Sequence, residues 1–329
     1  LNGLKYYFYI SLRIFKFYLY YMDYSILIVA FFLSALIHYG VQKLFIYNKR
    51  FDNFNHRSSH KTLATRTGGI GIFLTLLSIS LYNYFRGIEI FDYSLFIPLG
   101  IMFIIGVYDD LYNADFKLKF FIQIIVAKIL IDQGYVISNY HGLFGIYEVP
   151  WLLAQLSTVF VFLVVVNAIN FIDGIDGLAL TEVIKIIIVV EFFSNGITSL
   201  NTLGFIVISS IIPLYYYNFK KKRKVFLGDG GSMLLGVLIM IYILFTLGES
   251  YSFKPKLVSN KTLFVILILF YPLIDLLRVF ILRIAKGHSP FKPDQNHIHH
   301  ILLKKYDSPL KALIIIQFIN LLFILILIL

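Results

Sequence analysis

The residues best suited to chemistry in this chain are acids and amides that stand in short clusters between long apolar stretches. The segment 167–177 reads Asn-Ala-Ile-Asn-Phe-Ile-Asp-Gly-Ile-Asp-Gly, and its polar members are Asn167, Asn170, Asp173 and Asp176. Side chains three residues apart share one face of a helix, so we expect this face to persist until Gly174 breaks the helix. A plain helix–turn–helix, with Asp176 capping the next helix, is the alternative.

A second cluster, Phe-Leu-Gly-Asp-Gly-Gly-Ser, covers residues 226–232 and begins with Phe226. Three glycines let backbone N–H groups approach an anion, and a helix N-terminus favours phosphate. Asp229 would repel phosphate there unless a divalent cation lay between them, so the pattern predicts a metal ligand. An ordinary Gly-Asp-Gly turn is the alternative. We interpret the five cations at 220–224 as topology determinants, the alternative being attraction of anionic lipid or substrate.

Two further clusters carry groups that can bind phosphate. Asp109 and Asp110 precede Lys119, and a carboxylate pair can hold Mg²⁺ or accept a proton while lysine supplies a point charge. Capping and snorkelling at the membrane interface would explain the same three residues. The other cluster holds Asn296, His297, His299 and His300. Imidazoles bind phosphate and sugar hydroxyls, whereas zinc is disfavoured because cysteine and an evident fourth ligand are missing from the sequence.

The composition decides where such clusters must sit. Of 329 residues 59% are hydrophobic and 14% charged, and mean hydropathy is +0.82, against roughly 45–50% and about 25% in soluble domains. This excludes a water-soluble enzyme. The absence of cysteine excludes disulfides and thiolate chemistry. The net charge of +11 indicates basic loops on the cytoplasmic side rather than binding of nucleic acid.

Ten apolar runs are candidates for membrane spans of about 20 residues. They cover residues 25–46, 68–85, 93–108, 118–132, 152–170, 177–194, 199–217, 232–248, 262–284 and 310–329. Alternate loops carry sixteen Lys and Arg residues against four, which puts the richer loops in the cytoplasm. All four clusters lie in those loops. We therefore predict an all-α polytopic membrane protein of about ten helices, with an active-site cleft at its cytoplasmic face.

The two ends of the chain are predicted to differ. Residues 1–21 form an extension rich in tyrosine, phenylalanine and basic residues, and we expect the natural start to be Met22, the alternative being an interfacial aromatic helix. Residues 22–329 are predicted to form a single transmembrane domain. In its first loop, Arg57 and Arg66 lie among polar residues, and a substrate role is weighed equally against a solvated basic loop.

Together the motifs resemble the polyprenyl-phosphate N-acetylhexosamine-1-phosphate transferases of glycosyl transferase family 4. Members carry the Asp-Asp pair with a following lysine, the Asn-x-x-Asn-x-x-Asp-Gly-x-Asp-Gly run, Phe-x-Gly-Asp-x-Gly-Ser and His-x-His-His, in this order. The form of the histidine segment and the Arg-Ser-Ser-His of the first loop are closer to the branch that initiates O-antigen and teichoic acid than to the peptidoglycan branch. The chain departs from the usual Pro-x-Arg-Gly-Gly-Gly pattern, because threonines flank Arg66.

The resemblance implies transfer of a sugar 1-phosphate from a UDP-N-acetylhexosamine to polyprenyl phosphate with release of UMP, at the bacterial inner membrane. Implied partners are these two substrates and the membrane; a homodimer is compatible, and the sugar stays open. Mg²⁺ is the implied cofactor, with Mn²⁺ as the alternative, bound by Asp229 and Asn170. Asp109 and Asp110 would activate the lipid phosphate, and Asp173 and Asp176 would position the nucleotide. Other substrate contacts would come from Lys119, Asn167, Phe226, Arg57, Arg66, Asn296, His297, His299 and His300.

Two rival functions belong to other classes. A secondary transporter would use intramembrane acids, but it would place them near the bilayer midplane rather than at span ends. A phosphotransferase acting on CDP-linked alcohols begins its motif with Asp-Gly-x-x-Ala-Arg. Residues 176–180 read Asp-Gly-Leu-Ala-Leu and lack that arginine.

Overall fold

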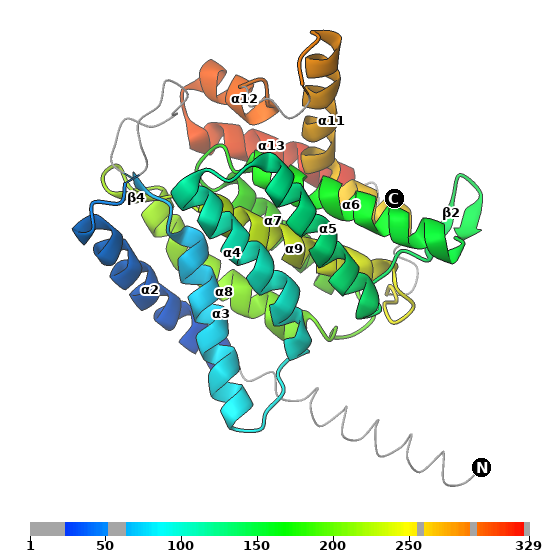
Figure 1. The fold of residues 1–329 in the computed structure, drawn as a ribbon, viewed down its shortest axis with the longest axis horizontal. Coiled ribbons are helices and arrows are strands. Elements are labelled where there is room, and N and C mark those ends of the chain that lie inside the picture. The colour runs from blue at the N-terminus through cyan, green and yellow to red at the C-terminus, as the bar shows by residue number, and fades with distance from the viewer. Residues whose placement is uncertain (1–23, 52–63, 255–259, 290–294, 326–329) are drawn as a thin grey trace.

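Long apolar runs form helices throughout the described part of the chain (Figure 1). The computed structural model describes residues 24–51, 64–254, 260–289 and 295–325, so the predicted extension 1–21 lies outside it. The helices are α2 (Tyr24–Tyr47), α3 (Gly68–Phe85), α4 (Phe96–Tyr112, preceded by the short η1, Tyr93–Leu95), α5 (Phe116–Asp132), α6 (Trp151–Ile172), α7 (Leu178–Phe193), α8 (Asn201–Asn218), α9 (Gly228–Leu247), α10 (Lys261–Ile268), α11 (Phe270–Ala285), α12 (Ile298–Tyr306) and α13 (Pro309–Leu325).

The predicted class of fold, a helical polytopic membrane protein, is confirmed. A helix covers most of the described part of each of the ten predicted spans. Within the described residues, five helical stretches are long and apolar enough to cross a membrane: α2, α3, α4 together with η1, α6 and α9. The pair α10 and α11 would make a sixth. The protein is therefore polytopic, and the number ten stays a prediction.

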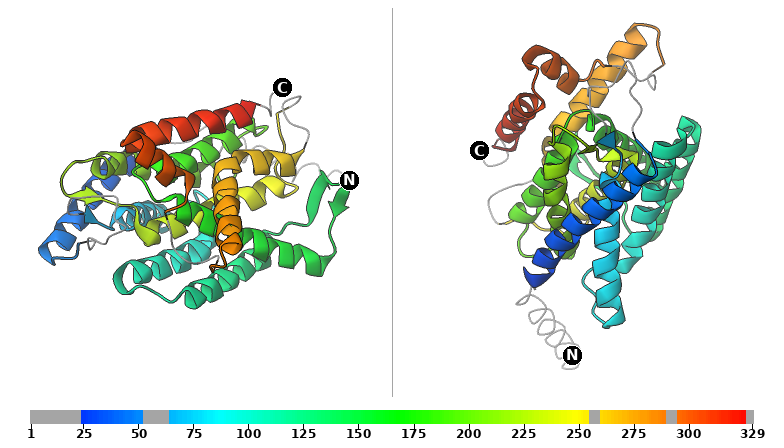
Figure 2. Two further views of the ribbon diagram at one scale, coloured as in Figure 1. Left: turned by 90° about the horizontal axis from the view of Figure 1, so that it is seen from above. Right: turned by 90° about the vertical axis from the view of Figure 1, so that its left-hand side faces the viewer.

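The predicted span 262–284 is not one straight helix. It breaks at Leu269, where α10 and α11 meet at a bend of 70°. Pro272 in the first turn of α11 has no N–H to donate to the carbonyl of Ile268, which weakens the helical ladder across the junction. As a result α11 projects away from the other helices (Figures 1 and 2).

Helix α9 forms the centre of the fold. Nearly all its residues are buried, and it packs against α3, α4, α6, α7 and α10. Its sequence is apolar on every side after the first turn, and such a helix needs partners on every side. The bundle surrounds α9 for this reason, and the first turn of α9 lies at one end of the bundle.

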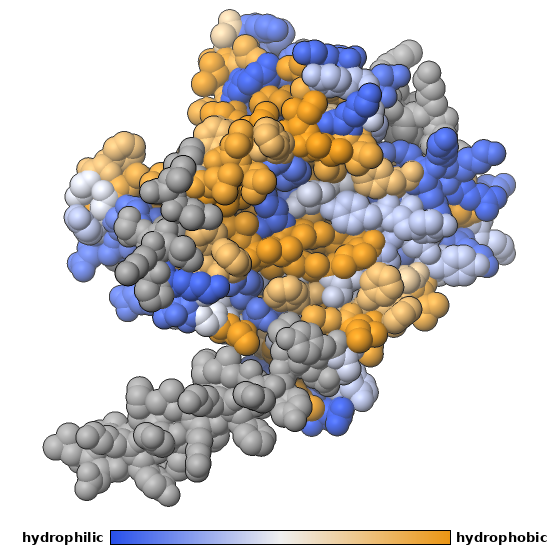
Figure 3. Space-filling view, turned by 180° about the vertical axis from the view of Figure 1, so that it is seen from behind, coloured by the Kyte–Doolittle hydropathy of each residue, from blue (hydrophilic) through white to orange (hydrophobic). Residues whose placement is uncertain are grey.

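The outer surface is apolar. Large hydrophobic side chains are exposed along α2, α6 and α13, among them Phe32, Leu36, Phe160 and Phe318. Figure 3 shows hydrophobic side chains over much of one face. A soluble protein seldom leaves so much contiguous apolar surface in water, so this surface fits a lipid environment.

Two short pairs of strands were not predicted. Strands β2 (Asn139–Leu143) and β3 (Ile146–Glu148) form a hairpin between α5 and α6. Strand β1 (Ala64–Thr65) pairs in parallel with β4 (Lys224–Val225). Beyond this pair, the N–H of Phe226 donates to the carbonyl of Thr65 over 2.8 Å. These hydrogen bonds attach residues 64–65, at the end of the first loop, to the stretch that leads into α9.

Close backbone contacts bring α3, α4 and α9 together at the end of the bundle that carries the polar clusters. A Cβ atom on Gly69 would lie 2.2 Å from the backbone nitrogen of Gly231. A Cβ atom on Gly106 would lie 2.3 Å from the backbone oxygen of Asp229. Only glycine permits these approaches, as small residues do where membrane helices cross closely.

Gly106→Ala should therefore force α4 and α9 apart. Overpacking of this kind costs about 1–3 kcal/mol, so we expect a lower melting temperature of the detergent-solubilised protein. Gly100→Ala in the same helix is the matched control, because its Cβ would meet only the Phe73 ring, at 3.9 Å. Equal melting temperatures for the two variants would contradict the proposed contact.

Candidate active site

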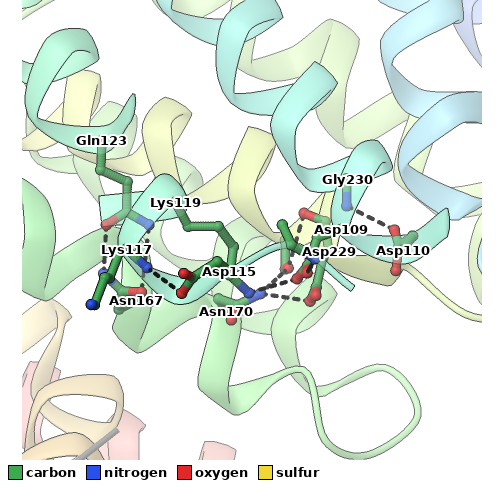
Figure 4. Close-up of polar contacts among 12 residues, drawn as sticks. Asp109, Asp110, Asp115, Lys117, Lys119, Gln123, Asn167, Asn170, Asp229 and Gly230 are labelled. Carbon is green, nitrogen blue, oxygen red and sulfur yellow. Dashed lines mark hydrogen bonds and ion pairs between the residues drawn. The ribbon is translucent and has the colours of Figure 1, made fainter. Parts of the chain in front are cut away.

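Three helix ends bring predicted site residues together at one end of the bundle (Figure 4). Asp109 lies at the end of α4, Asn170 near the end of α6 and Asp229 in the first turn of α9. Asn170 Nδ2 donates to Asp229 Oδ1 over 2.9 Å and lies 2.7 Å from the Oγ of Ser232. The side chain of Asp109 also reaches that of Asp229. The predicted convergence of these three segments is confirmed.

Asp109 is held by the turn between α4 and α5. Lys119 in α5 donates to its Oδ2 over 2.6 Å, and the N–H of Ala114 donates to its Oδ1 over 2.7 Å. The turn is tight because Asn113 adopts a left-handed conformation, with φ of 54°. Both oxygens of a nearly buried carboxylate are thus oriented, and the ammonium group lies beside it.

Asp110 faces the other side of the same turn, against the start of α9. Its Oδ2 accepts the N–H of Gly230 over 3.0 Å, and its Oδ1 lies 3.3 Å from Nη1 of Arg66. Gly228 has φ of +75°, and a Cβ there would lie 2.6 Å from Asp110 Oδ2. A glycine at this position is required for both reasons. Arg66 is partly exposed, so its guanidinium can reach solvent or a ligand.

The turn between α6 and α7 carries Asp173 and Asp176. The capping role considered for Asp176 in the helix–turn–helix alternative is wrong: Gly177 occupies the capping position with φ of 77°, without a side-chain capping bond. The carboxylate of Asp176 instead forms an ion pair with Lys224. Lys224 belongs to the basic run that the sequence suggested was a topology determinant, so at least one of its members serves the site.

The pKa of Asp173 reflects both the burial and the charge of the cluster. Burial raises its pKa well above the usual range, and the nearby carboxylates of Asp229, Asp110 and Asp176 raise it further. Arg66 acts in the opposite direction. Within the described residues, the five clustered aspartates are accompanied by three cations, Lys119, Arg66 and Lys224, which leaves an excess of two negative charges if all are ionised. Oxygen donors with such an excess suit a hard divalent cation.

Asn167 stands apart from this cluster. Its amide pairs with that of Gln123 in α5, with a donor–acceptor distance of 2.8 Å, and its Nδ2 also lies 2.7 Å from the carbonyl oxygen of Leu163. The pair lies beside the acidic cluster in Figure 4, with Asn170 between them. Gln123 was missed as a contributor to the site, although a buried glutamine in an apolar helix was a usable signal.

The histidine segment lies against the turn that carries Asp173. The ring of His299 fills the space over Gly174, where a Cβ atom would lie 2.3 Å from its Nε2. Gly174 therefore makes room for a histidine, while the left-handed turn residue is Gly177. Burial lowers the pKa of His299 well below its usual value, aided by the neighbouring His300 and His297, so its imidazole is neutral.

Asp275 in α11 is a further residue that sequence reasoning missed. It is fully buried and accepts a hydrogen bond from His297. Its signal was an acid inside a stretch read as a span. Arg278, one turn later, donates to the backbone oxygen of Asn296 over 2.6 Å. This contact involves the backbone of Asn296, so the substrate contact predicted for its side chain stays a prediction.

Two other predicted residues, Arg57 and Phe226, lie outside the acidic cluster as described. Arg57 lies outside the described residues. Phe226 is half-buried at the entrance to α9, where its carbonyl accepts the N–H of Gly68 over 2.9 Å, and stacking of its ring on uracil stays a prediction.

A cavity of about 1140 Å³ lies at the other end of α3 and α8 and does not include the acidic cluster. Its lining includes Ser78, Tyr82, Arg86 and Asn201.

Comparisons with known proteins agree with this geometry. The sequence profile described as Glycosyl transferase family 4 matches residues 93–247, which contain every acid of the cluster. The undecaprenyl-phosphate alpha-N-acetylglucosaminyl 1-phosphate transferase of Escherichia coli K12 is 30% identical over 275 residues, covering 80% of this chain and 72% of that protein. The same-named protein of Yersinia pestis is 30% identical over 304 residues, covering 88% and 79%. The probable undecaprenyl-phosphate N-acetylglucosaminyl 1-phosphate transferase of Bacillus subtilis is 30% identical over 307 residues, covering 90% and 83%. With an acidic cluster assembled from the matched segments and relatives aligned over most of their length, this chain belongs to glycosyl transferase family 4.

Proposed function

We propose that this protein transfers N-acetylglucosamine 1-phosphate from UDP-N-acetylglucosamine to undecaprenyl phosphate at the cytoplasmic face of a bacterial inner membrane. The observation that carries the proposal is the cluster of five aspartates with Lys119 and Arg66 at one end of an apolar bundle. One substrate is soluble and the other is a lipid, so their reaction needs a polar site at the membrane boundary. The choice of sugar and lipid is supported by the names of the three relatives. The product would begin a cell-surface glycan such as O-antigen.

The reaction is a phosphoryl transfer between two anions. An oxygen of the lipid phosphate attacks the β-phosphorus of the nucleotide sugar and forms a new P–O bond. The bond from that phosphorus to the bridging oxygen breaks, and UMP leaves with this oxygen. Transfers of this kind depend on positioning and on neutralisation of charge. Direct attack requires no covalent intermediate on the protein.

Magnesium fits the donor set of this site. Asp229 and the carbonyl oxygen of Asn170 would hold it, because the amide nitrogen of Asn170 already donates to Asp229 and Ser232. Burial is the main cause of the raised pKa of Asp173, and the nearby carboxylates raise it further; a divalent cation would offset this second contribution. When bound, Mg²⁺ would neutralise diphosphate charge.

The remaining side chains have roles that follow from their contacts. Lys119 and Arg66 each hold one aspartate and stay partly exposed, so they can also bind phosphate oxygens. Asp109 and Asp110 would orient the lipid phosphate and accept its proton. Asp173 and Asp176 would position the nucleotide.

Asp229→Asn should abolish Mg²⁺-dependent UMP release from detergent-solubilised protein. It should also abolish the rise in melting temperature that we expect Mg²⁺ to cause in the wild type, since ligand binding stabilises the folded state. A variant that still responds to Mg²⁺ in both assays would remove Asp229 from the metal site.

Lys119→Ala should lower kcat/KM for UMP release by about 10²-fold, a typical loss when one group that stabilises transition-state charge is removed. Lys117→Ala is the matched control, because Lys117 lies two residues earlier on α5 and is exposed. Comparable losses in the two variants would indicate a general effect of surface charge. A panel of UDP-sugars assayed with the wild type tests the choice of sugar.

A further inference from the structure

A buried carboxylate that the proposed mechanism does not use organises the histidine segment. Asp275 lies in α11 and is fully buried. Its Oδ2 lies 2.8 Å from Nδ1 of His297, and its Oδ1 accepts the N–H of Ile298 over 2.7 Å. Ile298 is the first residue of α12, so one oxygen holds the imidazole and the other satisfies a free donor at the helix start.

The first of these bonds determines the form of the imidazole. An ionised carboxylate only accepts hydrogen bonds, so Nδ1 of His297 must carry the proton. In the neutral ring, Nε2 then bears the lone pair and acts as an acceptor. A carboxylate behind a histidine also holds the ring in one orientation, as it does behind many histidines that bind metals or transfer protons.

Helix α11 also contacts the next histidine of the segment, His299, which lies against the turn that carries Asp173. His299 is fully buried, with its Nδ1 3.1 Å from the hydroxyl of Tyr271 and 3.7 Å from Asp275 Oδ2. Its Nε2 has no hydrogen-bond partner among the described residues and lies over Gly174, the residue after Asp173. Tyr271 and Asp275 are one turn apart on α11. The contacts of α11 thus extend through two imidazoles to the catalytic turn.

We propose that Asp275 is a positioning residue: it fixes the Nδ1-protonated form of His297 and the start of α12, and thereby seats the histidine segment against the turn that carries Asp173. The inference rests on the proposed function, in which that segment contacts the sugar or the diphosphate. Imidazoles held in one orientation can bind such groups through a ring nitrogen in a fixed position.

A metal ion in place of these hydrogen bonds is the competing explanation. Oxygen and nitrogen atoms of Asp275, His297 and His299 lie within 4.8 Å of one another. However, both oxygens of Asp275 accept bonds of ordinary hydrogen-bond length, and a metal would have to displace the proton from Nδ1 of His297. We therefore expect the purified protein to contain no stoichiometric zinc by elemental analysis, and its presence would overturn the proposal.

The kinetic test is a double-mutant cycle on the full-length protein in detergent. Asp275→Asn should lower kcat/KM for UMP release about 10–100-fold, as loss of a supporting carboxylate does elsewhere. His297→Ala should lose at least as much. The double variant should lose no more than His297→Ala alone, because the amide oxygen of the asparagine can still accept the N–H of Ile298, so that Asp275→Asn removes only the contact with that ring. Multiplying losses in the double variant would overturn the proposal.

A matched control separates positioning from stability. Glu182 in α7 is also a fully buried carboxylate, hydrogen-bonded to Gln317 of α13 over 2.8 Å and also to Asn320. Glu182→Gln should lower the melting temperature and leave kcat/KM of the folded protein unchanged. If Asp275→Asn behaves in the same way, its role is structural and the proposal fails.

A spectroscopic measurement distinguishes failure of this inference from failure of the proposed function. In protein labelled with ¹⁵N-histidine, the signal that disappears in His297→Ala should have the shift of a protonated Nδ1, and Asp275→Asn should change it. This readout needs no substrate. A wild type with the expected signal but without UMP release would refute the proposed function alone, whereas an unprotonated Nδ1 would refute the positioning role.

Discussion

The contact of bare backbone between α3, α4 and α9 is the constraint on which the rest of this structure depends. Gly69 meets Gly231, and Gly106 meets the carbonyl of Asp229, at separations that exclude a Cβ atom. Because neighbouring helices surround α9, its first turn lies between the end of α4 and the end of α6. The packing of apolar helices thus decides how far apart the acidic side chains lie.

That packing places carboxylates close together, which is electrostatically unfavourable. Burial is the main cause of the raised pKa of Asp173, and three neighbouring aspartates add their repulsion. The chain offsets part of it with cations from distant segments: Arg66 follows β1, Lys119 belongs to α5 and Lys224 to β4. The remaining negative charge suits the divalent cation proposed above.

The histidine segment is held against the acidic cluster by α11 and α12. The bend between α10 and α11 redirects the chain by 70°, so that α11 projects from the bundle and carries Asp275 to the histidines. A straight span would have kept that carboxylate within the row of membrane helices. The second buried carboxylate, Glu182, has a different role, since Gln317 and Asn320 of α13 donate hydrogen bonds to it and so connect α13 to α7.

Hydropathy and short motifs were sufficient to predict the helices and the acidic clusters, because both depend on local sequence. An apolar run of about 20 residues has few alternatives to a helix in a membrane. The alternation of basic loops placed the clusters at one end of the bundle. Tertiary structure alone decided which partners those residues have. The pairing of Asp176 with Lys224 joins positions 48 residues apart, and that of Asp275 with His297 joins α11 to the start of α12, 22 residues later. The space over Gly174 is defined by a histidine from α12. Such contacts depend on how far and at what angle helices cross, which is set by the packing of side chains and backbone from several segments at once.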